Sequence, residues 1–170
     1  MAELRDLLED SSEVDNINAS GTVSGQKVGV FAYLSAPFDT ETTVAGTYYP
    51  ILGTFTNGPI ECFSAAVTYT PGIKYDCSLT QWFEVDWHAS VSAEVVNTVF
   101  HCGVMKNGVL VGGSIMGTFA KNAGQVYAVS GTAVIELAVG DEIQLVCTSD
   151  QATKDLTFQE FTTTISEFFD

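Results

Sequence analysis

Few side chains in this sequence have the types and spacing that catalysis needs, and each has a simpler structural explanation. His101 directly precedes Cys102, a pair that a thiol protease would use as base and nucleophile. Both residues fall in a predicted strand from Thr98 to Met105, where neighbouring side chains point to opposite faces. We therefore expect Cys102 to be a packed apolar residue and not a nucleophile.

Two carboxylates share one face of a second predicted strand. Glu84 and Asp86 stand two residues apart, which places them about 6 to 7 Å from each other, within the range that glycosidases use. Alternation along an acidic strand produces such pairs without any catalysis, and His88 continues the same polar face. The sequence contains no nucleophile elbow, P-loop, H-E-x-x-H or dinucleotide motif. We predict that the protein is not an enzyme, with a carbohydrate hydrolase on a jelly roll as the catalytic alternative.

The cysteines give no support to a metal site. None of the four stands in a C-x-x-C pair. The acidic opening MAELRDLLED lacks the apolar core of a signal peptide, so we expect synthesis in a reducing cytosol and four free, mostly buried thiols. No cofactor is expected. The ion that the sequence suits best is calcium, because oxygen-rich predicted loops contain Asp39, Glu41, Asp150 and Asp155.

Charge and hydropathy restrict the partners. Six Lys and Arg face 21 Asp and Glu, which gives a net charge of −15 and predicts repulsion from nucleic acid and from anionic membranes. A basic or neutral protein partner fits this balance better. The hydrophobic fraction is 46% and the mean hydropathy is +0.21, yet no stretch reaches the roughly 18 to 20 apolar residues of a membrane span. The apolar surplus therefore belongs to a core and to subunit contacts.

Residues 1–20 form a predicted N-terminal acidic arm. Leu4, Leu7 and Leu8 recur at helical spacing among acidic residues, although one or two turns are marginal as an isolated helix. A frayed tail and a docking arm whose leucines bind a neighbouring molecule are both compatible with the pattern.

Residues 21–170 are predicted to be one β domain. Within the predicted strand from Trp82 to Val91, the residues from Phe83 onwards alternate strictly between apolar and polar, which is typical of a half-buried strand. Asn107-Gly108 between two apolar runs predicts a tight hairpin. Further strands are expected at 131–137, 142–147 and 156–168, and the spacing Phe158-Gln159-Glu160-Phe161 predicts a β-bulge in the last one. Short strands with frequent turns indicate an all-β sandwich or jelly roll.

Two long segments are almost free of charge. Only Lys121 is charged between Lys106 and Glu136, and only Glu61 between Thr42 and Ile73. A subunit interface is depleted in charge in this way, and so are strands covered on both faces within one monomer. We favour an oligomer, because closed association also covers the open edges of a sandwich.

The order of motifs from Trp82 onwards resembles the jelly roll of tumour necrosis factor and of complement-type globular heads. The aromatic strand comes first, followed by the Lys106-Asn107-Gly108 hairpin, then by Ser130 to Leu137 with Val139-Gly140-Asp141, and finally by the Phe-rich terminal strand. The resemblance covers roughly residues 80–168 and implies a tight homotrimer about an axis lined with apolar and aromatic side chains. We expect the trimer interface to include Phe119, Tyr127, Phe158, Phe161 and Phe168.

Phage structural proteins reuse this trimeric fold, so the resemblance implies a structural virion protein. The expectation is a decoration (cement) protein, made in the host cytoplasm and placed on the capsid surface, that binds the major capsid protein across capsid subunits. The alternative is a receptor-binding tip or adaptor of a phage tail or head fibre. Fold-level analogy carries this step.

Overall fold

The computed structural model describes residues 29–34, 36–52, 55–57 and 62–168, and these residues form strands and loops without a helix. The predicted arm, residues 1–20, lies outside the described residues. The thirteen strands are β1 Gly29–Leu34, β2 Phe38–Thr42, β3 Tyr49–Pro50, β4 Phe55–Asn57, β5 Phe63–Ala65, β6 Ile73–Tyr75, β7 Gln81–Ala93, β8 Thr98–Lys106, β9 Val109–Leu110, β10 Met116–Ala120, β11 Val126–Leu137, β12 Glu142–Ser149 and β13 Lys154–Glu167.

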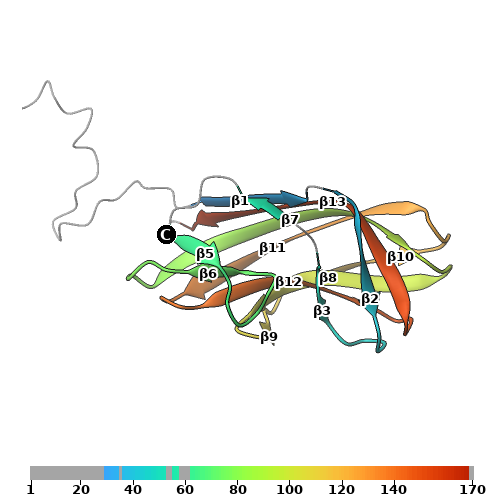
Figure 1. Ribbon diagram of the computed structural model, residues 1–170, viewed down its shortest axis with the longest axis horizontal. Helices are drawn as coiled ribbons and strands as arrows, with labels where there is room; N and C mark the ends of the chain where they lie inside the picture. Colours follow the sequence, from blue (N-terminus) through green and yellow to red (C-terminus); the bar gives the residue numbers. More distant parts are fainter. Residues whose placement is uncertain (1–28, 35, 53–54, 58–61, 169–170) are drawn as a thin grey trace, which may run out of the picture.

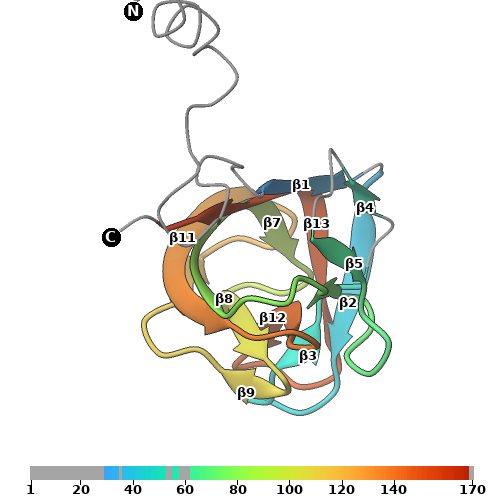
Figure 2. The same ribbon diagram turned by 90° about the vertical axis from the view of Figure 1, so that its left-hand side faces the viewer.

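The strands build two antiparallel sheets. The six-stranded sheet has the order β11-β7-β13-β1-β4, and β2 also pairs with β13. The seven-stranded sheet has the order β10-β8-β12-β6-β5, with β3 paired to β12 and β9 to β8. The long strands run along the length of the molecule in Figure 1, and Figure 2, seen from its end, shows β1, β13 and β7 in one layer and β8, β12 and β3 in the other. The predicted antiparallel jelly-roll sandwich is confirmed.

The core lies between the two layers, and β7 shows why the sequence specifies it. Its apolar set points inward, so Phe83, Val85, Trp87 and Val91 are fully buried while His88 is exposed. The predicted alternation is therefore confirmed. Aromatic rings from both sheets complete this core at edge-to-face or stacked geometries, which are favourable for ring pairs. These contacts include Phe63–Phe83, Tyr75–Phe83, Phe38–Phe158 and Trp87–Phe161.

Two local predictions about the backbone are also confirmed. Asn107 and Gly108 connect β8 to β9 with φ values of +51° and +78°, the left-handed conformation that this pair of residue types tolerates. In β13 the pairing with β7 shifts register between Phe158 and Glu160. Because Gln159 is the extra residue of this bulge, Phe158 and Phe161 both point into the core instead of to opposite faces.

Candidate subunit interface

The outer face of the six-stranded sheet carries mostly polar side chains near the β13 bulge. The registers of β11, β7 and β13 place Ser130, His88 and Thr162 in one row across the three strands. The next row consists of Ala128, Ser90 and Glu160.

A hollow of about 240 Å³ opens on this face, where the β13 bulge meets β7 and β11. Its polar side chains have no hydrogen-bond partner among the described residues, and its apolar lining combines the outward-facing Ala128 with three buried residues of the same strands. This hollow, called the bulge hollow below, therefore contains hydrogen-bonding groups that no described residue uses. The polar lining is His88, Ser90, Ser130, Glu160 and Thr162, and the remaining lining is Ala89, Ala128, Val129 and Phe161.

Apolar side chains gather at the opposite end of the same face. Trp82 is 51% exposed, and Val134, on the neighbouring strand, is 42% exposed. The Phe168 amide donates a hydrogen bond to the Trp82 carbonyl oxygen at 2.8 Å, so the half-exposed Phe168 follows β13 beside Trp82. Two exposed aromatic rings and a valine at one end of a sheet are a natural contact point for another apolar surface.

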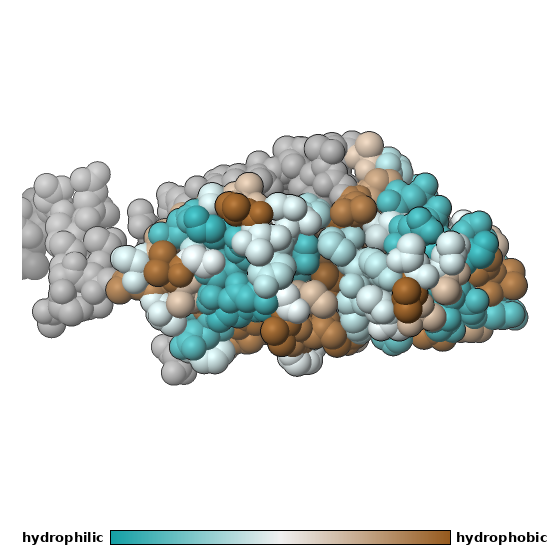
Figure 3. Space-filling view, turned by 60° about the horizontal axis from the view of Figure 1, so that its bottom comes forward, coloured by the Kyte–Doolittle hydropathy of each residue, from teal (hydrophilic) through white to brown (hydrophobic). Residues whose placement is uncertain are grey.

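One side of the sandwich ends in two strand edges without a partner among the described residues. In this part of the chain, β10 pairs with β8 alone and β11 with β7 alone. This β10/β11 edge carries Met116, Phe119 and Val126, each about half exposed. Apolar residues gather along the lower margin of the surface in Figure 3, whereas much of the remaining view is pale or teal. Open edges with apolar side chains favour association with another chain.

The structure places His101 and Cys102, the pair that suggested a thiol protease, on opposite faces of β8. Cys102 is 1% exposed in the core, and burial raises the pKa of its thiol well above the ordinary value, which keeps it protonated. His101 lies on the other face of β8, against Gly117 of β10. Asp86 accepts a short hydrogen bond from the Thr132 hydroxyl on the neighbouring strand. None of these groups faces another in a way that would activate a nucleophile.

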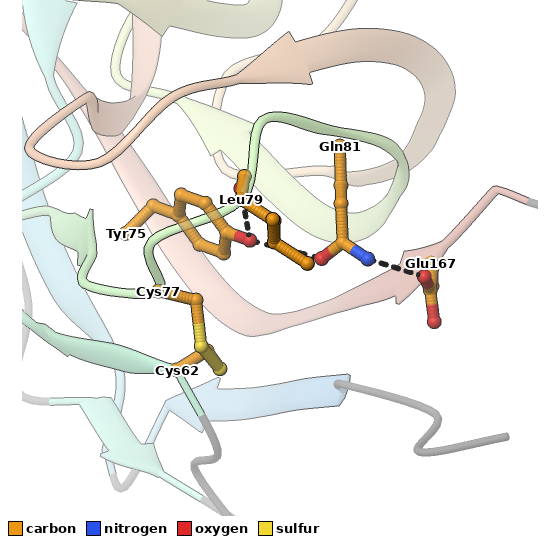
Figure 4. The surroundings of a disulfide bond; sticks show 6 residues. All are labelled: Cys62, Tyr75, Cys77, Leu79, Gln81 and Glu167. Atoms are coloured by element: carbon orange, nitrogen blue, oxygen red, sulfur yellow. Dashed lines mark hydrogen bonds between the residues drawn. A yellow bond between two sulfur atoms is a disulfide. The ribbon is translucent and has the colours of Figure 1, made fainter. Parts of the chain in front are cut away.

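The prediction of four free thiols is wrong. Cys62 and Cys77 form a disulfide, shown in Figure 4. They flank the hairpin of β5 and β6, where the Asp76 amide donates to the Cys62 carbonyl at 2.8 Å and the two Cα atoms are 4.9 Å apart. Cys102 and Cys147 remain free, as opposed residues on β8 and β12. The burial part of the prediction holds for this pair, and burial raises the pKa of Cys147 to about 12.

The segment after the disulfide is connected by side chains to the end of β13. The Tyr75 hydroxyl lies 2.8 Å from the Leu79 carbonyl oxygen and 2.9 Å from Gln81 Oε1. Gln81 Nε2 donates to Glu167 Oε1 at 2.7 Å, as Figure 4 shows. The disulfide hairpin therefore holds the beginning of β7 and, through it, the end of the strand that precedes Phe168.

A second polar centre, which the sequence analysis missed, fixes the loop before β6. The Glu142 carboxylate, on a residue only 5% exposed, accepts hydrogen bonds from the amides of Val67, Thr68 and Tyr69 at 2.7–3.1 Å. Burial acts to raise the pKa of Glu142, but these amides and the charge of Lys74 lower it below its ordinary value. The sequence offered only the Gly-Asp-Glu turn as a sign, because the three donors are more than 70 residues away.

The acidic residues of the predicted loops do not converge on a cation. Asp39 accepts a hydrogen bond from the Thr157 hydroxyl, and Asp150 accepts one from the Val99 amide. Within residues 29–168, gaps excepted, no group of three or more His, Cys, Asp or Glu is arranged to hold a metal ion. The same residues include no helix of the length and hydropathy needed to cross a membrane.

Comparison of the structure with solved ones decides the type of jelly roll. The Eiger TNF of S. frugiperda superposes with a TM-score of 0.53 over 85% of this chain and 94% of its own, at 8% identity. The chain has a TNF-like jelly-roll fold. At this identity the likeness concerns the fold alone.

Two further structures are similar at TM-scores too low to support an inference. The PRD1 vertex protein P5 has a TM-score of 0.43 and 10% identity over 85% of this chain and 100% of its own. The C-terminal domain of the sugar-binding protein EclA has a TM-score of 0.39 and 12% identity over 93% of this chain and 95% of its own. No family model matches the chain, and no curated protein matches its sequence.

The exposure of the side chains shows which of the residues expected at the trimer interface reach the surface. Phe158 and Phe161 are 0% and 1% exposed, so these two expectations are corrected: their rings are covered by the protein's own core. Phe119 and Phe168 are half exposed and stay available to a partner. Tyr127 is half buried, and its hydroxyl accepts from the Asn122 amide in the turn before β11. Leu4, Leu7 and Leu8 lie outside the described residues.

Proposed function

We propose that this chain is a non-enzymatic structural protein of a virion, a homotrimeric decoration protein that stabilises a bacteriophage capsid. The observation that carries the self-association is the distribution of exposed apolar side chains. Two groups of them lie at the β10/β11 edge on one side of the sandwich and at the Trp82 end of the six-stranded sheet face, while other exposed apolar side chains, such as Val67 and Val109, lie elsewhere on the surface. An edge on one copy and a face on the next form a head-to-tail contact, which closes into a ring when the rotation is 120°.

The acidic balance supports the second half of the proposal. With a net charge of −15, the protein suits a basic or neutral protein surface and not nucleic acid or an anionic membrane. Three copies held together present three equivalent contacts to the major capsid protein, so avidity compensates for weak individual contacts. The arm of residues 1–20, with its three leucines, is the segment proposed to contact capsid subunits.

The first experiment is the absolute mass of the purified protein by light scattering. The 18.2 kDa chain is expected to report three copies. A monomer at every concentration would remove the trimer and with it the main support for the decoration role.

A second experiment tests the capsid contact. A variant that lacks residues 2–15 is expected to remain trimeric and to lose binding to purified capsids, while the full chain binds in the same assay. Undiminished binding by this variant would show that the arm is not the contact.

A receptor-binding tip or fibre adaptor is the second candidate, and two adjoining loops favour it. The Gly46 amide donates to the Ser149 carbonyl and the Thr153 amide to the Thr42 carbonyl, both at 2.8 Å, so the loops after β2 and after β12 lie together. Val44 on the first of these loops is 57% exposed. Saturable binding of the isolated protein to host cells would favour this role, and binding to capsids without binding to cells would favour decoration.

A further inference from the structure

One lysine among the described residues has no ionic partner. Lys74, Lys106 and Lys154 pair with Asp76, Asp141 and Glu94 at 2.7, 2.7 and 3.5 Å. Lys121 is exposed, immediately follows β10, and makes no ion pair or side-chain hydrogen bond within residues 29–168 as the structure describes them. Lys121 is therefore a positively charged side chain at the β10/β11 edge that no described acidic residue neutralises.

The bulge hollow contains the matching anion. Glu160 is exposed on its rim and has no ion pair or hydrogen bond to its side chain within the described part of the chain. The other charged residues on the outer rows of β7 and β11 are Glu84, Asp86 and Glu136, so no cation of the same face neutralises it. His88 is its single basic neighbour in the lining.

The two groups lie toward the same end of the strands. The Asn97 amide donates to the Lys121 carbonyl and the Gly124 amide to the Ala93 carbonyl, so Lys121 lies at the end of the sandwich where β7 finishes. Glu160 is paired with Ser90, three residues before Ala93 on that strand, which corresponds to about 10 Å. A rotation about an axis that runs along the strands keeps this height, and a lysine side chain extends over much of the difference.

We propose that Lys121 of one copy enters the bulge hollow of the next copy and pairs there with Glu160. The inference rests on the proposed homotrimer and names the contact that fixes its register. The uncommitted hydroxyls of Ser90, Ser130 and Thr162 accept hydrogen bonds from the incoming ammonium group, whose three donors need several acceptors. In a closed ring of three copies, each Lys121 and each Glu160 then has a partner on a neighbouring copy.

Charge reversal tests the pair. Lys121→Glu and Glu160→Lys are each expected to weaken association about tenfold, because two like charges then meet at every subunit contact. The double variant Lys121→Glu/Glu160→Lys restores opposite charges and is expected to recover association to within about threefold of the unmodified protein. Lys154→Glu is the matched control, since Lys154 already pairs with Glu94 in its own chain and is expected to leave association unchanged.

Mass against protein concentration separates the possible outcomes, and protection of the buried Cys102 thiol verifies that each variant is folded. A monomeric unmodified protein would remove the homotrimer and this contact together. A trimer that neither reversal weakens, or that weakens without recovery in the double variant, would overturn the Lys121–Glu160 pair and leave the homotrimer intact. Weakening by both single reversals with recovery in the double variant would support the pair.

Discussion

Replacing both Cys62 and Cys77 by serine tests the disulfide that the sequence analysis did not foresee. The bond closes a loop with a sequence separation of 15 residues. In the chain-entropy description, a loop of this length restricts the unfolded chain enough to stabilise the fold by about 3 kcal/mol at 25 °C. With a urea dependence of about 2 kcal/mol per M, the double serine variant is expected to unfold at about 1.5 M less urea.

The assay is equilibrium unfolding in urea, with and without dithiothreitol. The reductant is expected to lower the midpoint of the unmodified protein to that of the double variant, and to leave the double variant unchanged, which makes this variant its own control. Thiol titration of the denatured, non-reduced protein is expected to find two free cysteines, Cys102 and Cys147. Four titratable thiols, or a midpoint that dithiothreitol does not move, would refute this account of the β5–β6 hairpin.

Three further substitutions test the packing and the polar centre. Gly131→Ala is expected to destabilise the fold by about 1–3 kcal/mol in urea unfolding, because a Cβ would lie 2.6 Å from the Trp87 ring, whereas Gly112→Ala meets no atom within 4 Å and is expected to change little. Phe158→Ala is expected to cost about 3–5 kcal/mol in the same assay, and a cost below 1 kcal/mol would contradict its position in the core. Since the pKa of Glu142 is lowered by folding, its contribution is present above the ordinary value of 4.5 and is lost as the pH falls through the folded value, so Glu142→Gln is expected to flatten the decline of stability in acid. An unchanged acid decline in this variant would show that other carboxyl groups cause it.

Patterns contained within one strand were predictable from the sequence. The alternation from Trp82 to Val91 fixed which side chains point inward, because the pleat has a period of two. The Asn107-Gly108 turn and the bulge after Phe158 were predictable for the same reason, since each depends on a few consecutive residues. Each of these features is determined by consecutive residues, so it can be predicted without knowing which other strands lie beside it.

Features that depend on distant strands were not predictable. Cys62 and Cys77 become neighbours through a hairpin of two three-residue strands, whose weak pattern gave no sign of pairing. Phe158 was expected at a subunit interface because the family resemblance implies an axis lined with aromatic side chains, and an aromatic residue in a strand has the same pattern whether its own core or another copy covers it. The bulge hollow depends on the registers of β7, β11 and β13 together, which the sequence does not display.

The extra residue of the β13 bulge determines which side chains of the following segment point into the core and which point to the outer face. Gln159 is the one residue of this stretch without a partner on β7, since Phe158 is paired with Val91 and Glu160 with Ser90. Its insertion changes the phase of the pleat by one step, which turns Phe161 inward and presents Glu160 outward. A strand that lacked this residue would keep a continuous ladder with β7 but would place Phe161 on the outer face. A single inserted amino acid thus sets both the hydrophobic packing of one layer and the shape that the molecule offers to its surroundings.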